Sequence, residues 1–137
     1  KMSSAMVRKE DEKAEEVEVT AADQKDINTF SRLHNKLHEL EDEVKNKKEE
    51  LLNLTDATDE LMMVMDDDVP IKYVVGESYV EMSKDEVEER LESAVNETNE
   101  AVAGFERQMD DVRAELKELK RRLYGKFGKS INLEEDS

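Results

Sequence analysis

The chain has 137 residues, with 37 acidic and 21 basic side chains and a formal net charge of −16 at pH 7. Charged residues make up 42% of the sequence and aromatic residues only 4%, so a wide globular core is not expected. What remains is disorder, or elongated helices that bury a narrow apolar stripe. Nucleic-acid phosphates and anionic membrane surfaces would repel so acidic a chain, and we expect neither as a partner.

Five segments follow one another along the sequence. We predict a disordered acidic arm at 1–19, a first coiled-coil helix at 20–66, a connector with a β-hairpin at 67–82, a second coiled-coil helix at 83–124 and a flexible tail at 125–137. No apolar run approaches the roughly 20 residues that cross a bilayer. The first residues lack the apolar stretch of a signal peptide, and there is no cysteine. These features predict a cytosolic protein without disulfides.

The first helix is indicated by a heptad repeat. Its core positions are Phe30, Leu33, Leu37, Leu40, Val44, Leu51, Leu54, Leu61 and Met65, with Lys47 and Thr58 as polar exceptions. Thr20 is the predicted N-cap, and Asp23 places a carboxylate in the first turn. Pro70 and the three aspartates at 66–68 are expected to end the helix.

After Val87, the second helix shows the same alternation of three- and four-residue steps. Its core positions are Val87, Leu91, Val95, Val102, Phe105, Met109, Val112, Leu116, Leu119 and Leu123, with Thr98 as the polar exception. Ser83 and Glu86 form a predicted capping box, and Met82 with Val87 a hydrophobic staple. Two such helices joined by a short connector predict a mainly α fold, a long antiparallel two-helix coiled coil with both termini at one end.

The connector has the pattern of a β-hairpin. Two runs rich in β-forming residues flank Gly76-Glu77, which suits a type II′ turn. The resulting register places five apolar residues on one face, namely Ile71, Tyr73, Val75, Val80 and Met82. An isolated two-stranded hairpin is marginally stable in water and has open edges. We therefore expect an obligate oligomer in which this face joins strands from other chains.

No enzyme chemistry is indicated. His34 and His38 lie one helical turn apart, but the zincin pattern requires Glu where Asn35 stands, so surface histidines are expected rather than a metal site. Residues 128–130 resemble the end of a phosphate-binding loop without its earlier glycine, and the aspartates at 66–68 lack the spacing of a calcium loop. We expect no catalytic residue, no metal and no cofactor.

The helix ends near the two termini are unusually apolar for so acidic a chain. The residues concerned are Ile27, Phe30, Leu123, Tyr124, Phe127, Ile131 and Leu133. They could close the coiled coil as a plug, or some could stay exposed as an adaptable apolar patch for a partner. The residues themselves leave both interpretations open.

Several stretches resemble a known family over roughly residues 17–136. They are Val19-Thr20 with Asp23-Gln24, Ile27-Asn28 and Phe30; Asp66-Asp67-Asp68; Pro70 with Tyr73 and Gly76; and Leu123-Tyr124-Gly125-Lys126-Phe127-Gly128 with Ile131-Asn132-Leu133-Glu134. Together with the order helix, single hairpin, helix, they resemble the β-type subunits of prefoldin. The stretch from Leu123 to Glu134 is the most specific part of this resemblance.

The resemblance implies a function that composition alone does not. Prefoldin is a cytosolic, ATP-independent hexamer of two α-type and four β-type subunits, whose hairpins assemble into inter-subunit β-barrels. It holds non-native actin and tubulin and delivers them to the cytosolic group II chaperonin. By this resemblance the five apolar hairpin residues would serve assembly. The candidates for client contact are Ile27, Phe30, Leu123, Tyr124, Phe127 and Ile131.

A structural adaptor is the competing function: a coiled-coil subunit that scaffolds a complex without holding clients. An adaptor needs only a closed seam, whereas a holding chaperone needs accessible apolar residues at the helix ends. A DNA-binding zipper does not fit, because no basic region precedes either heptad repeat.

Overall fold

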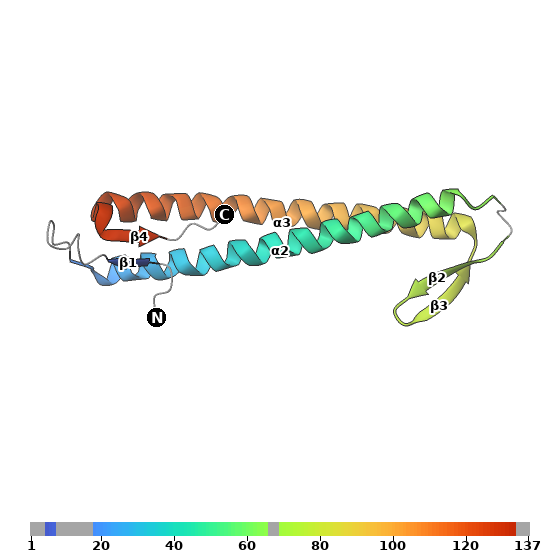
Figure 1. Ribbon diagram of the computed structural model, residues 1–137, viewed down its shortest axis with the longest axis horizontal. Helices are drawn as coiled ribbons and strands as arrows, with labels where there is room; N and C mark the ends of the chain where they lie inside the picture. Colours follow the sequence, from blue (N-terminus) through green and yellow to red (C-terminus); the bar gives the residue numbers. More distant parts are fainter. Residues whose placement is uncertain (1–4, 8–17, 66–68, 134–137) are drawn as a thin grey trace. The chain divides into compact units, whose positions relative to one another are not determined.

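The protein is described here by a computed structural model covering residues 5–7, 18–65 and 69–133 (Figure 1). Its elements are β1 (Ala5–Val7), α2 (Ala21–Met62), β2 (Ile71–Val75), β3 (Ser78–Met82), α3 (Lys84–Phe127), a 3-10 turn (Gly128–Ser130) and β4 (Ile131–Leu133). Two long helices and a hairpin confirm the predicted mainly α class.

The chain divides into two compact units. The terminal unit comprises Lys1–Glu41 and Arg107–Ser137, and the hairpin unit comprises Asp42–Glu106. Each helix contributes one segment to each unit. Within the terminal unit, Asp26 of α2 pairs with Arg122 of α3, and Glu41 approaches Arg113. The pair with the higher residue number on α2 has the lower number on α3, so the two segments are antiparallel.

Both helices begin at the predicted caps. At the start of α2, Asp23 N–H donates to the Thr20 hydroxyl at 3.1 Å, and Thr20 N–H donates to the Asp23 carboxylate at 3.0 Å. At the start of α3, Glu86 N–H donates to the Ser83 hydroxyl at 3.3 Å. These side chains satisfy amide groups that have no partner within the helix.

Both helices end at other residues than predicted. Helix α2 stops at Met62, where amides of residues 63 and 64 bond to carbonyls three residues back and Lys84 Nζ donates to the Val64 carbonyl at 2.9 Å. Met65, predicted in the seam, is 97% exposed as a result. The aspartates at 66–68 lie outside the described residues. Helix α3 continues through Gly125 to Phe127 and ends before Gly128, whose φ of +56° suits a helix C-terminus.

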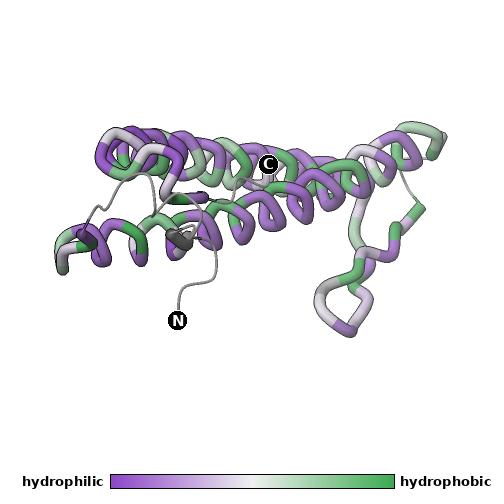
Figure 2. Tube along the Cα trace, turned by 60° about the vertical axis from the view of Figure 1, so that its left-hand side comes forward, coloured by the Kyte–Doolittle hydropathy of each residue, from purple (hydrophilic) through white to green (hydrophobic). Residues whose placement is uncertain are grey.

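The predicted apolar stripes supply most of the buried side chains, and Figure 2 shows hydrophobic and hydrophilic residues alternating along both helices. The buried stripe residues are Phe30, Leu33, Leu37, Leu40, Val44, Leu61, Val87, Leu91, Met109, Val112, Leu119 and Leu123. The polar exception Thr98 is also buried, and its hydroxyl donates to the Ala94 carbonyl at 2.8 Å. Within the described part of the chain, no buried side-chain polar atom lacks a partner.

The hairpin has the predicted register. Its pairs are Ile71 with Met82, Lys72 with Glu81, Tyr73 with Val80, Val74 with Tyr79 and Val75 with Ser78. Gly76 has a φ of +61°, and no described residue other than glycine has a positive φ. A positive φ at the first central position alone is the geometry of the predicted type II′ turn.

A second strand pair lies in the terminal unit, where we predicted a disordered arm and a flexible tail. Strand β1 pairs antiparallel with β4, with Ala5 opposite Leu133, Met6 opposite Asn132 and Val7 opposite Ile131. In β4, Ile131 and Leu133 are buried while Asn132 is exposed, so the tail has the alternation of a half-buried strand. We call β1 and β4 together the strap. The remaining arm residues, 1–4 and 8–17, lie outside the described part.

None of the helices described is apolar enough over a sufficient length to cross a membrane.

Candidate functional site

The residues predicted for client contact are brought together in the terminal unit, and nearly all are buried. Leu123 and Phe127 are 1% exposed, and Phe30 and Ile27 are 2% exposed. We call the buried set the terminal plug; it consists of Ile27, Phe30, Leu123, Phe127, Ile131 and Leu133. Of the six predicted residues, only Tyr124 is half-buried. In this structure the plug is closed.

The strap and the end of α3 explain why the plug is closed. After Phe127, Gly128 turns the chain and β4 runs back beside α3 (Figure 1). Leu133 N–H donates to the Tyr124 hydroxyl at 3.3 Å, which ties the strand to the helix. Ile131 and Leu133 are each 3% exposed. The tail therefore supplies part of the plug, which heptad analysis of the helices alone could not show.

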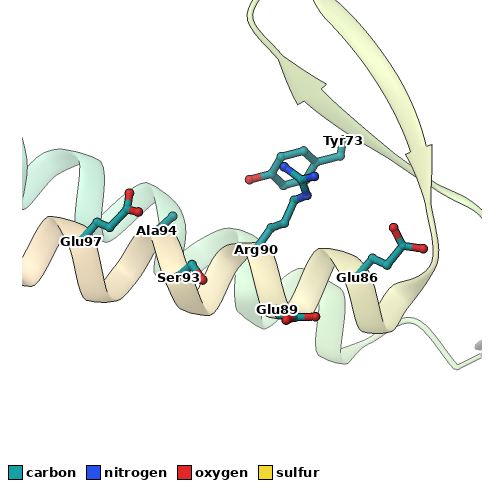
Figure 3. Close-up of a pocket in the computed structure, with 7 residues that line it drawn as sticks. All are labelled: Tyr73, Glu86, Glu89, Arg90, Ser93, Ala94 and Glu97. Atoms are coloured by element: carbon teal, nitrogen blue, oxygen red, sulfur yellow. The ribbon is translucent and has the colours of Figure 1, made fainter.

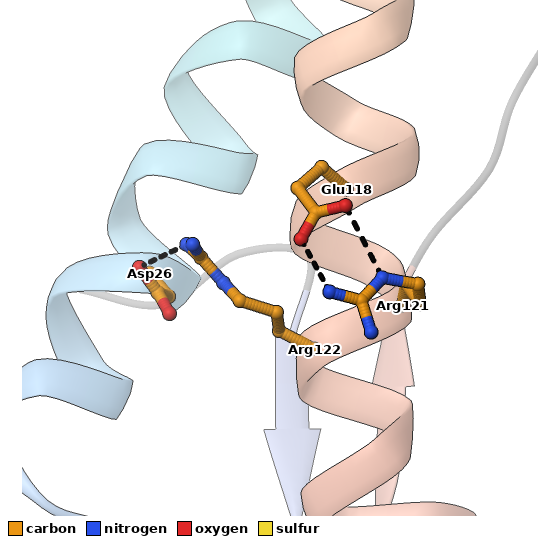
Figure 4. A network of polar contacts seen from close by, with 4 residues as sticks. All are labelled: Asp26, Glu118, Arg121 and Arg122. Carbon is orange, nitrogen blue, oxygen red and sulfur yellow. Dashed lines mark hydrogen bonds and ion pairs between the residues drawn. The ribbon is translucent and has the colours of Figure 1, made fainter.

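Ion pairs join the two helices beside the plug. Arg122 of α3 donates to the Asp26 carboxylate at 3.0 Å (Figure 4). Lys126 donates to the Asp23 carboxylate. The hydrogen bond from Lys126, with that from the Thr20 amide, holds the pKa of Asp23 below its usual value. Sequence reasoning assigned Asp23 to the helix start and missed Lys126. The sequence did contain a signal for these ion pairs. The first turns of α2 are acidic and the last turns of α3 are basic, and an antiparallel arrangement brings them side by side.

A further pair lies on α3 itself. Arg121 donates to Glu118 at 2.6 Å through Nη2 and at 3.2 Å through Nε (Figure 4). This bidentate contact lowers the pKa of Glu118 and raises that of Arg121. Both side chains are at least half exposed, so the pair contributes little to stability.

The two histidines converge on one side of α2. The Nε2 atoms of His34 and His38 lie 3.3 Å apart. His38 Nδ1 lies 3.0 Å from Oε1 of Glu41, and the His34 ring stacks on Phe30 with centroids 6.1 Å apart. Among the described residues, no group of three or more histidine, cysteine, aspartate or glutamate side chains could hold a metal ion.

The predicted assembly face of the hairpin is partly occupied by the chain's own helices. Met82 is buried in a cluster with Leu61, Val87 and Leu91, and Ile71 and Tyr73 pack against that cluster. Val80 remains 41% exposed. The side chain of Val75 lies outside the described part.

The opposite face of the hairpin is open. Val74 is 57% exposed and its strand partner Tyr79 is 70% exposed. Near the end of α2, Met62 and Met63 are 71% and 79% exposed. The hairpin unit therefore exposes several large apolar side chains, as a surface that binds another protein does.

A groove of about 550 Å³ lies where the hairpin meets α3 (Figure 3). Its lining is Tyr73, Glu86, Glu89, Arg90, Ser93, Ala94 and Glu97. In Figure 3 the Arg90 side chain rises from α3 toward the Tyr73 ring of the hairpin. The lining is mainly polar and carries three carboxylates, unlike the mainly apolar lining of small-molecule sites.

Comparison with known proteins places this architecture in a family. The sequence model of a family described as prefoldin subunit matches residues 24–130. The probable prefoldin subunit 4 of Dictyostelium discoideum is 45% identical over 134 residues, covering 98% of this chain and 100% of the relative. Prefoldin subunit 4 of Homo sapiens is 40% identical over 123 residues, covering 90% and 92%.

A more distant relative and a solved structure agree. Prefoldin subunit 4 of Saccharomyces cerevisiae is 33% identical over 117 residues, covering 85% of this chain and 90% of the relative. The crystal structure of the prefoldin beta subunit from Thermococcus strain KS-1 matches with a TM-score of 0.71 at 20% identity, covering 81% of this chain and 96% of that one. That structure supports the helix, hairpin, helix fold. The chain belongs to the prefoldin subunit family.

Proposed function

We propose that this chain assembles with α- and β-type prefoldin subunits into a cytosolic hexamer that holds non-native polypeptides, including actin and tubulin. The hexamer would deliver them to the group II chaperonin without ATP. Family membership supports the coarser statement: the chain is a non-enzymatic component of a prefoldin co-chaperone complex and its partners include other prefoldin subunits. The clients, the chaperonin and the compartment belong to the proposal.

Assembly through the hairpin is the first part of the proposal. Met82, Ile71 and Tyr73 anchor the hairpin to the helices. Among the described apolar side chains, Val80 on the same face and Val74 and Tyr79 on the other are left for a neighbouring subunit. Two strands alone are marginally stable, and added strands would also satisfy the open edges. Closure into an inter-subunit β-barrel would pair both edges of the hairpin and turn one of its faces toward the barrel interior.

Client holding is the second part. The observation that carries it is the terminal plug, which gathers the largest fully buried side chains of the described chain, Phe30, Leu123 and Phe127. The strap belongs to the same unit and is tied to α3 by the bond from Leu133 N–H to the Tyr124 hydroxyl. Opening the strap would expose these side chains together with Ile27, Tyr124 and Ile131. Several weak apolar contacts on different subunits would then give avidity without a tight single site. The net charge of −16 would help to keep an opened complex soluble.

The burial of the plug is also the observation that favours the alternative. A structural adaptor would keep the plug permanently closed as part of its fold. The two functions differ in one respect, whether the plug must open for the complex to act. A reversible lock on the strap distinguishes them.

The lock is a disulfide across the strap, made by the double variant Met6→Cys and Asn132→Cys. These residues face each other in the antiparallel pair, where Cα atoms lie about 4.5–5.5 Å apart, within the range that disulfides bridge. The chain has no cysteine of its own, so no competing disulfide can form within it. The assay is suppression of aggregation of denatured actin by the assembled complex, with native mass spectrometry as the check on assembly.

We expect the oxidised complex to lose most of its suppression and to regain it on reduction, at unchanged mass. The single variant Asn132→Cys, under the same oxidant, is the matched control and should behave as wild type. Equal suppression by the oxidised and reduced forms would show that client holding does not require β1 and β4 to separate. No suppression by any form, with an intact hexamer, would favour the adaptor.

A further inference from the structure

The sequence alone favours surface histidines at positions 34 and 38, but the geometry of the two rings points to another interpretation. We propose that His34 and His38 form a binding site for a divalent transition-metal ion of the Zn²⁺ class. Both residues stand on α2 in the terminal unit, four positions apart and therefore one turn apart on one side of the helix. Metal binding there would require only the two ring nitrogens, whether or not the complex holds clients.

The distance between the two nitrogens fits a shared metal ion. The Nε2 atoms lie 3.3 Å apart and face each other. Histidine nitrogens bind zinc at about 2.0–2.1 Å, and two such ligands at a tetrahedral angle lie about 3.3 Å apart. The rings therefore already have the spacing that a bound ion would require.

Glu41 fixes which nitrogen of His38 is available. A carboxylate only accepts, so the 3.0 Å contact requires that His38 Nδ1 carry a proton and donate it to Glu41. In the neutral ring, the lone pair is then on Nε2 and points to His34, which donates its own Nε2–H across the 3.3 Å contact. A metal ion would replace this bridging proton, and His34 would keep its proton by moving it to Nδ1. Glu41 is thus a positioning residue, in the arrangement common to zinc-binding histidines.

The surroundings allow an ion to reach the site. The His38 side chain is 42% exposed and His34 is half-buried, so solvent reaches both. Arg113 of α3 lies nearby, with Nη2 4.0 Å from the Glu41 carboxylate, and Asp110 in turn lies 3.7 Å from Arg113. Since the described residues offer no group of three or more ligands, water would complete the coordination. We expect weaker binding than at a four-ligand structural zinc site.

A bound ion would stiffen the part of α2 that carries the plug. Bridging positions four apart favours the helical form of residues 34–38 over any unfolded form. The His34 ring stacks on Phe30 at an interplanar angle of 13°, and Phe30 is one of the most deeply buried plug residues. Zinc should therefore slow hydrogen exchange of α2 amides near Phe30 in the assembled complex.

The test is titration of the assembled complex with zinc chloride by calorimetry, in excess Mg²⁺ to occupy the acidic surface. The variants are His34→Ala, His38→Ala and Glu41→Gln, and Lys36→Ala is the matched control on the same helix. All keep good helix formers, and circular dichroism confirms that the helices persist.

We expect wild type and the Lys36 variant to bind one more zinc per copy of this chain than either histidine variant. Glu41→Gln should retain the site with affinity reduced about tenfold or more. Slower amide exchange over residues 30–41 with zinc should occur only where both histidines are present. Equal zinc uptake by wild type and the histidine variants would overturn the proposal, as would loss of uptake in only one of them.

Discussion

Replacing Phe30 by alanine tests whether the terminal unit is a separate cooperative part of the molecule. Phe30 is 2% exposed and belongs to the plug. Truncating a buried phenylalanine to alanine typically costs about 3–5 kcal/mol, from lost apolar transfer and from the cavity left behind. Because every 1.4 kcal/mol is a factor of ten, local opening should rise by roughly two to three and a half orders of magnitude.

Hydrogen exchange of the assembled complex, read by mass spectrometry, measures this opening segment by segment. We expect faster exchange in residues 27–41 and 109–127, and nearly unchanged exchange in residues 51–61 and 87–102. Leu52→Ala is the matched control, since Leu52 lies on the same helix but is 62% exposed. Equal acceleration of both regions would refute the separation into a terminal and a hairpin unit. An effect as small as that of Leu52→Ala would refute the assignment of Phe30 to a tightly packed core.

Three further outcomes are expected. Gly128→Ala places a side chain at a φ of +56°, so docking of β4 should weaken by about 1–2 kcal/mol, seen as lost exchange protection of the Leu133 amide. Tyr79→Ser removes a 70% exposed ring, so native mass spectrometry should show a less stable hexamer while circular dichroism stays unchanged; a hexamer as stable as wild type would exclude this face from assembly. The pKa of Asp23 is lowered in the folded state, so its contribution is present above the usual value near 3.8 and lost as pH falls through the lowered value. Wild type should therefore melt above Asp23→Asn near neutral pH, and the gap in melting temperature should close in acid.

The elements that depend on local signals were predicted from sequence. Helix starts depend on a hydroxyl and a carboxylate three residues apart, and Thr20 with Asp23 and Ser83 with Glu86 form these contacts. The hairpin register depends on the two-residue turn at Gly76, and it has the predicted pairs. In each case the interacting residues are close in sequence, so residue types and spacing were sufficient to predict the structure.

The features that depend on distant residues were not predictable in the same way. Strand β1 pairs with β4 although over 120 residues separate them, and strands of three residues carry too little alternation to be recognised. Just after the end of α2, Lys84 reaches the Val64 carbonyl from the next helix. The sequence predicted that the plug residues lie near the helix ends. Whether these residues are buried depends on how the tail folds, which the sequence left open.

Docking of β4 is finely balanced, and this bears on the proposed function. Burying Ile131 and Leu133 contributes about 1.5–3 kcal/mol each, while fixing the backbone of the three β4 residues costs about 1–2 kcal/mol each. These terms nearly cancel, so the hydrogen bonds to β1 and to Tyr124 decide whether β4 stays docked. The nearby pair of Asp26 with Arg122 is partly exposed and adds little. Undocking β4 would therefore cost far less than separating the two helices, so the opening on which the proposed function depends would leave the coiled coil intact.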